Sequence, residues 1–152
     1  MKFSLIAILV LSFAGAAFAQ ETQVCFERVY SAEHLKKNPK QLVKAIRVTL
    51  TQEDNLYHSV DVITRRPIKG TTKFSSGGGC RISRGILNCG LDADGGNYNL
   101  TDNGKTAVLK VSSALFLYRT NVESGDDSEG RDLVLEAGSA NGIYRLNSVS
   151  CK

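Results

Sequence analysis

Apolar and polar residues alternate with a period of two along most of the chain. Successive side chains of a strand point to opposite faces, so this alternation predicts β-strands with one buried face. Leu115 and Leu117 are interleaved with Phe116 and Tyr118, which predicts a strand that is apolar on both faces. The alternating apolar positions are Ile46, Val48 and Leu50, then Val60 and Val62, then Ala107, Leu109 and Val111, then Leu133 and Leu135, and finally Tyr144 and Leu146.

Clusters of Gly, Asn, Asp and Ser separate these apolar runs, as expected of tight turns. The clusters lie at residues 53–55, 76–79, 94–97, 102–104, 124–126 and 138–142. About eight short strands joined by such turns are typical of a small antiparallel sandwich or barrel. The sequence therefore predicts an all-β fold and leaves both of these architectures open.

One segment, SAEHLKKNPKQLVKAI, departs from the two-residue period. Ser31 is a good N-cap residue, and charged residues follow it at helical spacing. Pro39 cannot continue a helix, because it lacks the backbone N–H and its ring clashes with the preceding turn. We predict one short helix at about 32–37 and a strand from about residue 42.

The N-terminus has the features of a secretory signal peptide. A positively charged start precedes an apolar run at 3–13, and Ala17 and Ala19 are the small residues that a signal peptidase recognises. We expect cleavage before Gln20, so residues 1–19 form the signal peptide. This apolar run is too short to span a membrane.

The rest of the chain, residues 20–152, has a length that suits a single domain. No later apolar run approaches the length of a membrane-spanning helix. Cys25 follows Thr22-Gln23-Val24 and not the small residue that precedes a lipid-bearing cysteine. We therefore predict a secreted or periplasmic protein that is not a lipoprotein and has no transmembrane segment in its mature form.

The four cysteines form an even number in an exported chain, which favours disulfides. The rival interpretation is a zinc site, but no cysteine pair has the close spacing of a zinc knuckle. In CRISRGILNC, a two-residue turn at Arg84-Gly85 would place Cys80 opposite Cys89 at a non-hydrogen-bonded pair, where side chains are closest. The second bridge is then Cys25–Cys151, which would join the two ends of the domain.

Charge is unevenly distributed along the chain. The net charge is +4, and it becomes +3 without Lys2 of the signal peptide. The middle of the chain is basic and free of acidic residues (Arg65, Arg66, Lys69, Lys73, Arg81 and Arg84), whereas a later segment is acidic (Glu123, Asp126, Asp127, Glu129, Asp132 and Glu136).

Two interpretations of this charge pattern are open. The two segments are either two solvated surfaces or a basic face that binds an anionic partner. Outside the cytoplasm, nucleic acid is not an expected partner. An acidic exported protein or an anionic envelope component, such as lipid headgroups or polysaccharide, fits that location better.

The segment NCGLDADGGNYN, residues 88–99, raises the question of a calcium site. Asp92 and Asp94 match the first and third ligand positions of a calcium-binding helix–loop–helix loop. The fifth and sixth positions, however, are Gly96 and Asn97 instead of an oxygen ligand and glycine. Two glycines followed by asparagine are typical of a hairpin turn, so we prefer the turn. A non-standard calcium site of Asp92, Asp94 and Asn97 is the alternative.

Few residues are candidates for catalysis. The chain lacks the motifs of nucleophile elbows, zinc proteases and phosphate-binding loops, and disulfide-bonded cysteines supply no thiolate. A hydrolase using His58 with Asp61 would need both side chains on one face, but residues three apart in a strand point to opposite faces. The sequence favours a non-enzymatic binding protein without a cofactor. A small hydrolase or an envelope structural protein is the alternative.

The segment KFSSGGGC resembles, over these few residues, a Ser-Gly-containing segment of the small exported bacterial lysozyme inhibitors, which are also disulfide-bonded β domains. Cys80 stands where that family has a Tyr after the Ser-Gly. The resemblance implies an inhibitor of an exported hydrolase, with Ser76 and the nearby basic residues contacting an acidic enzyme cleft. The candidate binding residues are therefore Arg65, Arg66, Lys69, Lys73, Ser76, Arg81 and Arg84.

Overall fold

The computed structural model describes residues 22–52, 55–92, 94–120, 132–139 and 142–151. The predicted signal peptide and most of the acidic segment (Glu123, Asp126, Asp127 and Glu129) lie outside these residues. The described elements are β1 (Thr22–Val29), α1 (Ala32–Lys37), β2 (Val43–Gln52), β3 (Leu56–Ile68), β4 (Thr71–Ser83), β5 (Ile86–Leu91), β6 (Gly96–Asp102), β7 (Thr106–Arg119), β8 (Leu133–Glu136) and β9 (Ile143–Val149).

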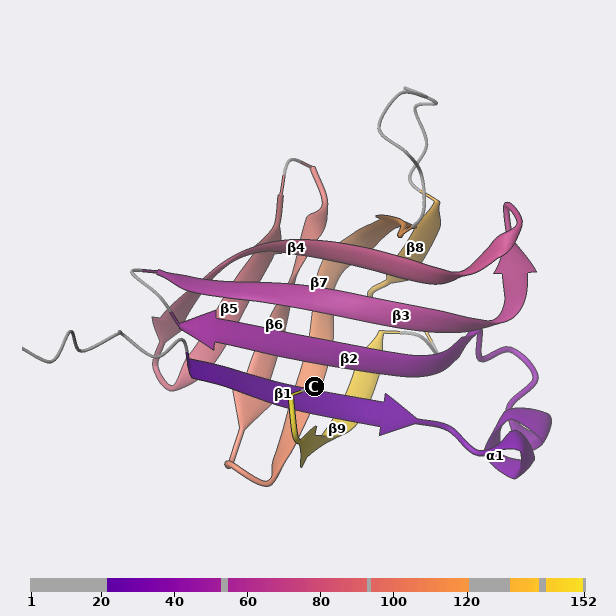
Figure 1. Ribbon diagram of the computed structural model, residues 1–152, viewed down its shortest axis with the longest axis horizontal. Helices are drawn as coiled ribbons and strands as arrows, with labels where there is room; N and C mark the ends of the chain where they lie inside the picture. The colour runs from indigo at the N-terminus through magenta and orange to yellow at the C-terminus, as the bar shows by residue number, and fades with distance from the viewer. Residues whose placement is uncertain (1–21, 53–54, 93, 121–131, 140–141, 152) are drawn as a thin grey trace, which may run out of the picture.

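The strands form one antiparallel sheet that closes into a barrel (Figure 1). Neighbours around the ring are β6, β5, β4, β3, β2, β1, β9 and β7, and pairing of β6 with β7 completes it. β8 is an outer strand that pairs with the second half of β7, at Ala114 to Leu117. The predicted all-β fold with one short helix is confirmed, and closure of the sheet selects the barrel over the sandwich.

The alternation of the sequence determines which residues fill the barrel. Ile46 and Val48 of β2 lie directly opposite Val62 and Val60 of β3, and all four side chains are buried. The same inward positions around the ring supply large rings and aliphatic side chains that pack into one core cluster, as in small barrels filled by side chains. The largest of these fully buried residues are Tyr98, Tyr144, Phe26, Phe74, Ile46, Leu100, Leu109, Leu115, Leu117, Leu135 and Leu146.

Two tight hairpins flank β4. Lys69 and Arg84 adopt φ of 48° and 51°, and each is followed by a glycine, Gly70 or Gly85, that also has positive φ. Two consecutive residues with positive φ are the requirement of the hairpin turn that matches the twist of the strands. The predicted turn at Arg84-Gly85 therefore forms, although a non-glycine residue rarely adopts this conformation.

Both predicted disulfides are present. Cys80–Cys89 joins directly opposed residues of β4 and β5, whose Cα atoms are 4.1 Å apart. Cys25–Cys151 joins β1 to the C-terminal residues across 126 positions of sequence. Disulfides form and persist in oxidising compartments, so the pair indicates an extracytoplasmic location.

In the part of the chain that the structure describes, α1 is far shorter than a helix that crosses a membrane.

The strands differ from the sequence prediction at one predicted turn, and they add detail at two other places. The cluster 76–79 is not a turn but lies inside β4, between β3 and β5. The apolar runs at 107–111 and 115–118 belong to one continuous strand, β7. Residues 22–29, for which the alternation predicted nothing, form β1 between β2 and β9.

Candidate functional site

The candidate site lies at the end of the barrel that carries both α1 and the β3–β4 hairpin, at the right of Figure 1. The side chain of Ser31 accepts a hydrogen bond from the backbone N–H of His34, which caps α1, and Leu35 is buried beneath the helix. The guanidinium of Arg65 donates a hydrogen bond of 3.0 Å to the carbonyl oxygen of Leu35. This bond joins the hairpin to the helix, so residues 30 positions apart lie together.

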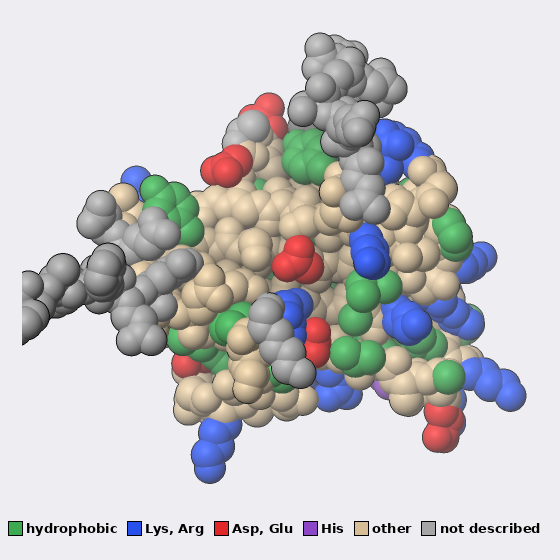
Figure 2. Space-filling view, in the orientation of Figure 1, with side chains coloured by type: hydrophobic (Ala, Val, Ile, Leu, Met, Phe, Trp, Pro, Cys, Tyr) green, Lys and Arg blue, Asp and Glu red, His purple; other side chains and the backbone are tan. Residues whose placement is uncertain are grey.

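Exposed basic side chains from three segments gather at this end, and we call them the basic rim. Figure 2 shows Lys and Arg side chains on the side of the molecule where α1 and the hairpin lie in Figure 1. Half of the set was predicted from the sequence, and the other half comes from α1 and the residues after it. The basic rim comprises Lys36, Lys37, Lys40, Lys44, Arg65, Arg66, Lys69 and Lys73, and all eight are exposed.

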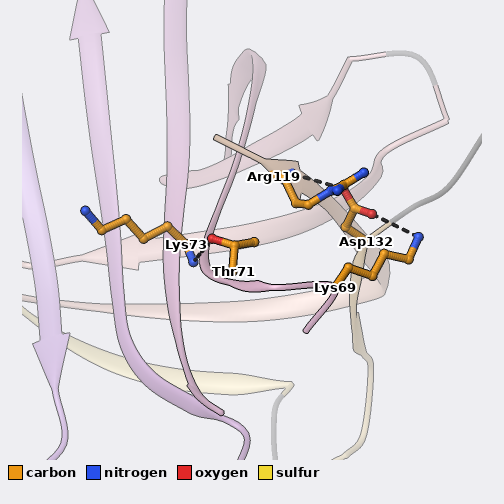
Figure 3. Close-up of polar contacts among 5 residues, drawn as sticks. All are labelled: Lys69, Thr71, Lys73, Arg119 and Asp132. Atoms are coloured by element: carbon orange, nitrogen blue, oxygen red, sulfur yellow. Dashed lines mark hydrogen bonds and ion pairs between the residues drawn. The ribbon is translucent and has the colours of Figure 1, made fainter. Parts of the chain in front are cut away.

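Asp132 contacts one member of the basic rim. Its side chain is 6% exposed and lies between Lys69 Nζ, 3.0 Å away, and Arg119 Nε, also 3.0 Å away (Figure 3). Burial would raise the pKa of Asp132, but hydrogen bonds from Lys69 and Arg119 outweigh burial and hold that pKa below its usual value. The basic and acidic segments of the sequence therefore meet at this carboxylate, and Lys69 is partly neutralised.

An open groove of about 480 Å³ lies beside the basic rim, between α1 and Ile143 of β9. The imidazole of His34 stacks on Tyr30, with ring centres 4.8 Å apart, and its Nε2 is 3.0 Å from Gln41 Oε1. The Arg28 guanidinium lies 5.2 Å from the centre of the Tyr30 ring, a cation–π distance.

The chemistry of this groove suits an anionic group. Burial raises the pKa of Tyr30 in spite of the nearby Arg28, so its phenol is neutral at physiological pH. Lys37 and Lys40 also line the groove. A hydroxyl, an aromatic face and two flexible cations can together hold a carboxylate or phosphate that carries an apolar part.

The structure does not bring all the predicted binding residues together. Arg81 and Arg84 lie at the far end of β4 from Lys73, and Arg84 is in the β4–β5 turn. Ser76 lies opposite Val60, so its side chain points to the inner face of the sheet. Ser76 is therefore not on the same face as the basic residues that the resemblance to lysozyme inhibitors groups with it.

The calcium alternative involves residues at the connection between β5 and β6. Asp92 and Asp94 are exposed, and the N–H of Gly95 donates to the carbonyl oxygen of Asp92 at 3.1 Å. Asn97 belongs to β6 and is also exposed. The hydrogen bond between Gly95 and Asp92 is typical of a tight turn. Calcium binding by Asp92, Asp94 and Asn97 stays a prediction.

His58 lies inside the barrel against the Cys80–Cys89 disulfide. Its Nδ1 is 3.1 Å from Cys80 Sγ, and its ring meets the Tyr98 ring edge to face at 5.1 Å. Burial lowers the pKa of His58 to about 4, and the charge of Asp92 opposes this only weakly. Because both sulfurs are bonded to each other, they offer no thiolate to a metal, although the three groups lie within 4.8 Å.

Asp61 lies on the outer face of β3 and accepts a hydrogen bond of 2.7 Å from Ser75 Oγ. His58 and Asp61 thus lie on opposite faces of the strand, as the spacing of three residues predicts. They do not form a catalytic pair.

The chain matches no family model, no curated protein and no solved structure. Its functional interpretation therefore depends on its own residues and their geometry.

The α1 half of the basic rim was not predicted, because its four lysines lie outside the acid-free basic segment at residues 65–84. The signal was present as the basic run LKKNPK in the predicted helix. Its position beside the hairpin, however, depends on how α1 packs on the barrel, which no local pattern encodes.

Proposed function

We propose that this protein is an exported, non-enzymatic binding protein that engages an acidic exported protein or another anionic envelope component through the basic rim. The observation that carries this proposal is the convergence of eight exposed Lys and Arg side chains from α1, the start of β2 and the β3–β4 hairpin. Arg65 and Lys69 hold contacts within the fold, but like charges repel, so the accumulation of all eight at one end of the barrel is not explained by these two contacts.

The environment of the basic rim supports binding rather than internal structure. Lys37 and Lys69 pair with Glu33 and Asp132, but Lys36, Lys40 and Arg66 extend into solvent at the same end. A patch of this kind attracts an acidic partner over about 8–10 Å at physiological salt and accelerates its association. The groove beside Tyr30 supplies the shape and polarity that a charged surface alone lacks.

The surroundings of the histidines also favour a binding role. His34 contacts Tyr30 and Gln41, and His58 contacts a disulfide and Tyr98. A general base must reach the proton of a nucleophile or of a water molecule. In the described residues neither imidazole has a hydroxyl or thiol nucleophile as its hydrogen-bond partner.

An exported hydrolase with an acidic cleft is one member of the proposed partner class. In that case the contact would be made by the basic rim and not by Ser76, which points into the barrel. Secretion to the periplasm or exterior through the predicted signal peptide is part of the same proposal.

The test is capture of partners by the immobilised exported protein, with both disulfides intact, from an extract of its own compartment. A variant with Lys36, Lys40, Arg66 and Lys73 changed to Glu removes the charge of the basic rim but keeps the hydrogen bond of Arg65 and the ion pair of Lys69. The matched control makes the same change of charge elsewhere on the barrel, at Arg84, Lys105, Lys110 and Arg145, which are all exposed.

We expect a stoichiometric partner that is released by raised salt, absent from the basic-rim variant and retained by the control variant. Equal loss in the two variants would mean that only the overall charge matters. Equal capture by the basic-rim variant and the parent, or no partner at low salt, would refute the proposal.

A further inference from the structure

Two glycines on the outer face of the barrel are not required by the backbone conformation or by the packing of the described residues. Gly79 and Gly90 are directly opposed in β4 and β5, and neither adopts positive φ. A Cβ atom built on either residue would meet no other heavy atom of the described residues within 4 Å. Glycine inside a strand destabilises the folded chain, because it loses the most conformational entropy on folding.

At the neighbouring glycines, Gly77 and Gly78, the fold itself requires the absence of a side chain. A Cβ atom on Gly78 would clash with the carbonyl oxygen of Gly90, and one on Gly77 would come within 2.9 Å of the carbonyl oxygen of His58. These two positions must be glycine for the strands to approach. No such close contact is present at the Gly79–Gly90 pair among the described residues, so the packing described there does not account for these two glycines.

The two glycines form the floor of a shallow outer trough. Register places Tyr57, Gly79, Gly90 and Asn97 in one row across β3, β4, β5 and β6, and these positions all face outward. Two open hollows of about 490 and 450 Å³ lie over this row and share Asn88 and Gly90 as lining residues. Three strand spacings separate the ends of the row, which is about 14 Å.

The walls of the trough are amides, one aromatic ring and one cation. The next row consists of Arg81, Asn88 and Asn99, which are directly opposed on β4, β5 and β6. Tyr57 is 48% exposed at one end of the glycine row. Among the described residues that line the two hollows there is no carboxylate.

We propose that this trough binds an uncharged oligosaccharide laid across the strands, with Tyr57 stacked on a sugar ring. Amide groups both donate and accept hydrogen bonds, as sugar hydroxyls do, and the Arg81 fork can donate to two neighbouring hydroxyls. Aromatic rings pack on the C–H face of a sugar. Because the two glycines carry no side chain, the oligosaccharide can approach their backbone closely. A trough of about 14 Å holds roughly two to three sugar units, given three strand spacings of about 4.8 Å each.

This site is separate from the basic rim. Its row runs through the middle of β4 and the outer face of β5 and β6, whereas the basic rim lies around α1 and the β3–β4 hairpin. The predicted ligand is also uncharged, so its binding is expected to be insensitive to salt. The two proposals can therefore fail independently.

The test is titration of the exported protein with three soluble tetrasaccharides: β-1,4-linked N-acetylglucosamine, cellotetraose and maltotetraose. Binding is followed by calorimetry and by the side-chain amide NMR signals of Asn88 and Asn97. The variants Gly79→Val and Gly90→Val place a branched side chain on the floor of the trough, in a position that is open to solvent. The matched control, Arg145→Val, replaces an outward side chain of β9 with valine.

We expect saturable binding of at least one tetrasaccharide, at least a tenfold loss in each glycine variant, and full binding by Arg145→Val and by the basic-rim variant. The glycine variants should melt at the temperature of the parent or above it, because valine is favoured in strands and meets open space. The proposal is overturned if no tetrasaccharide binds, if the glycine variants bind like the parent, or if they unfold at markedly lower temperature, since the glycines would then serve the fold.

Discussion

Burial inside the barrel keeps the imidazole of His58 uncharged, and it lowers the pKa from 6.5 to about 4. The unfolded chain therefore binds a proton between pH 6.5 and pH 4 that the folded chain does not. The free energy of unfolding falls as the pH falls through this window, by roughly 3 kcal/mol at about 1.4 kcal/mol per pKa unit.

Chemical denaturation at pH 7.5, 6, 5 and 4 measures this dependence. The variant His58→Leu replaces the imidazole with an apolar side chain that does not titrate, so its stability should change much less between pH 6.5 and pH 4. A variant that keeps the slope of the parent would show that another group carries the pH dependence.

Asp132 stabilises the fold because its buried carboxylate accepts hydrogen bonds from both Lys69 and Arg119. Its lowered pKa means that this contribution is present above about pH 4 and is lost as the pH falls below that value. We expect Asp132→Asn to lower the free energy of unfolding by about 1–3 kcal/mol at pH 7.

The exposed pair of Glu33 and Lys37 in α1 is the control for that prediction. Their atoms are 2.7 Å apart, but both side chains are more than two-thirds exposed. Glu33→Gln should therefore change stability by less than about 0.5 kcal/mol. Equal effects in the two variants, measured by urea denaturation, would contradict the importance of burial at Asp132.

Among the larger elements, the two disulfides should contribute unequally to stability. In the chain-entropy model, closing the ring of 126 residues between Cys25 and Cys151 is worth about 5 kcal/mol. Closing the ring of 9 residues between Cys80 and Cys89 is worth about 2.5–3 kcal/mol. The paired variants Cys25→Ala/Cys151→Ala and Cys80→Ala/Cys89→Ala should differ accordingly in denaturation midpoint, and a larger loss in the second pair would contradict this ranking.

Sequence patterns predicted an element wherever one face was buried and the other was solvated. The α1 range and the Cys80–Cys89 bridge followed from local rules of capping and hairpin register, and Cys25–Cys151 followed as the remaining pair. β1 was missed because Cys25 and Phe26 are both buried although they point to opposite faces, and this breaks the alternation. The disulfide to Cys151 attaches the C-terminal residues on the Cys25 side of the strand.

The glycines of β4 misled the prediction for a related reason. Glycine usually indicates a turn. At Gly77 and Gly78, however, it allows neighbouring backbones to approach, a requirement that exists only once β3, β4 and β5 are assembled. The basic rim was likewise half predicted, since Arg65 and Arg66 lie in one charged run but Lys36 and Lys40 join them only through packing of α1.

For the molecule as a whole, the closed barrel explains how a protein with a modest net charge can have a strong local positive field at one end. Most interior positions of the described residues are taken by apolar side chains, and His58 is uncharged there, so the Lys and Arg side chains lie on the outer face and at the two ends. The +4 charge of the chain is small, yet the basic rim alone carries eight cations. Under the proposed function, unequal distribution, rather than net charge, is the property that would select a partner.

Repulsion among the cations at one end of the barrel should lower the free energy of unfolding of the unbound protein. If the basic rim is kept for binding, the variant Lys40→Glu/Lys44→Glu should relieve repulsion and raise the free energy of unfolding by about 0.5–1 kcal/mol at low salt. Salt screens the repulsion, so 300 mM NaCl should stabilise the parent more than this variant. Urea denaturation at 20 and 300 mM NaCl measures both effects, with Lys105→Glu/Lys110→Glu as the control. A less stable variant, or equal salt responses in all three proteins, would mean that these lysines support the fold and would remove the argument that their clustering serves a partner.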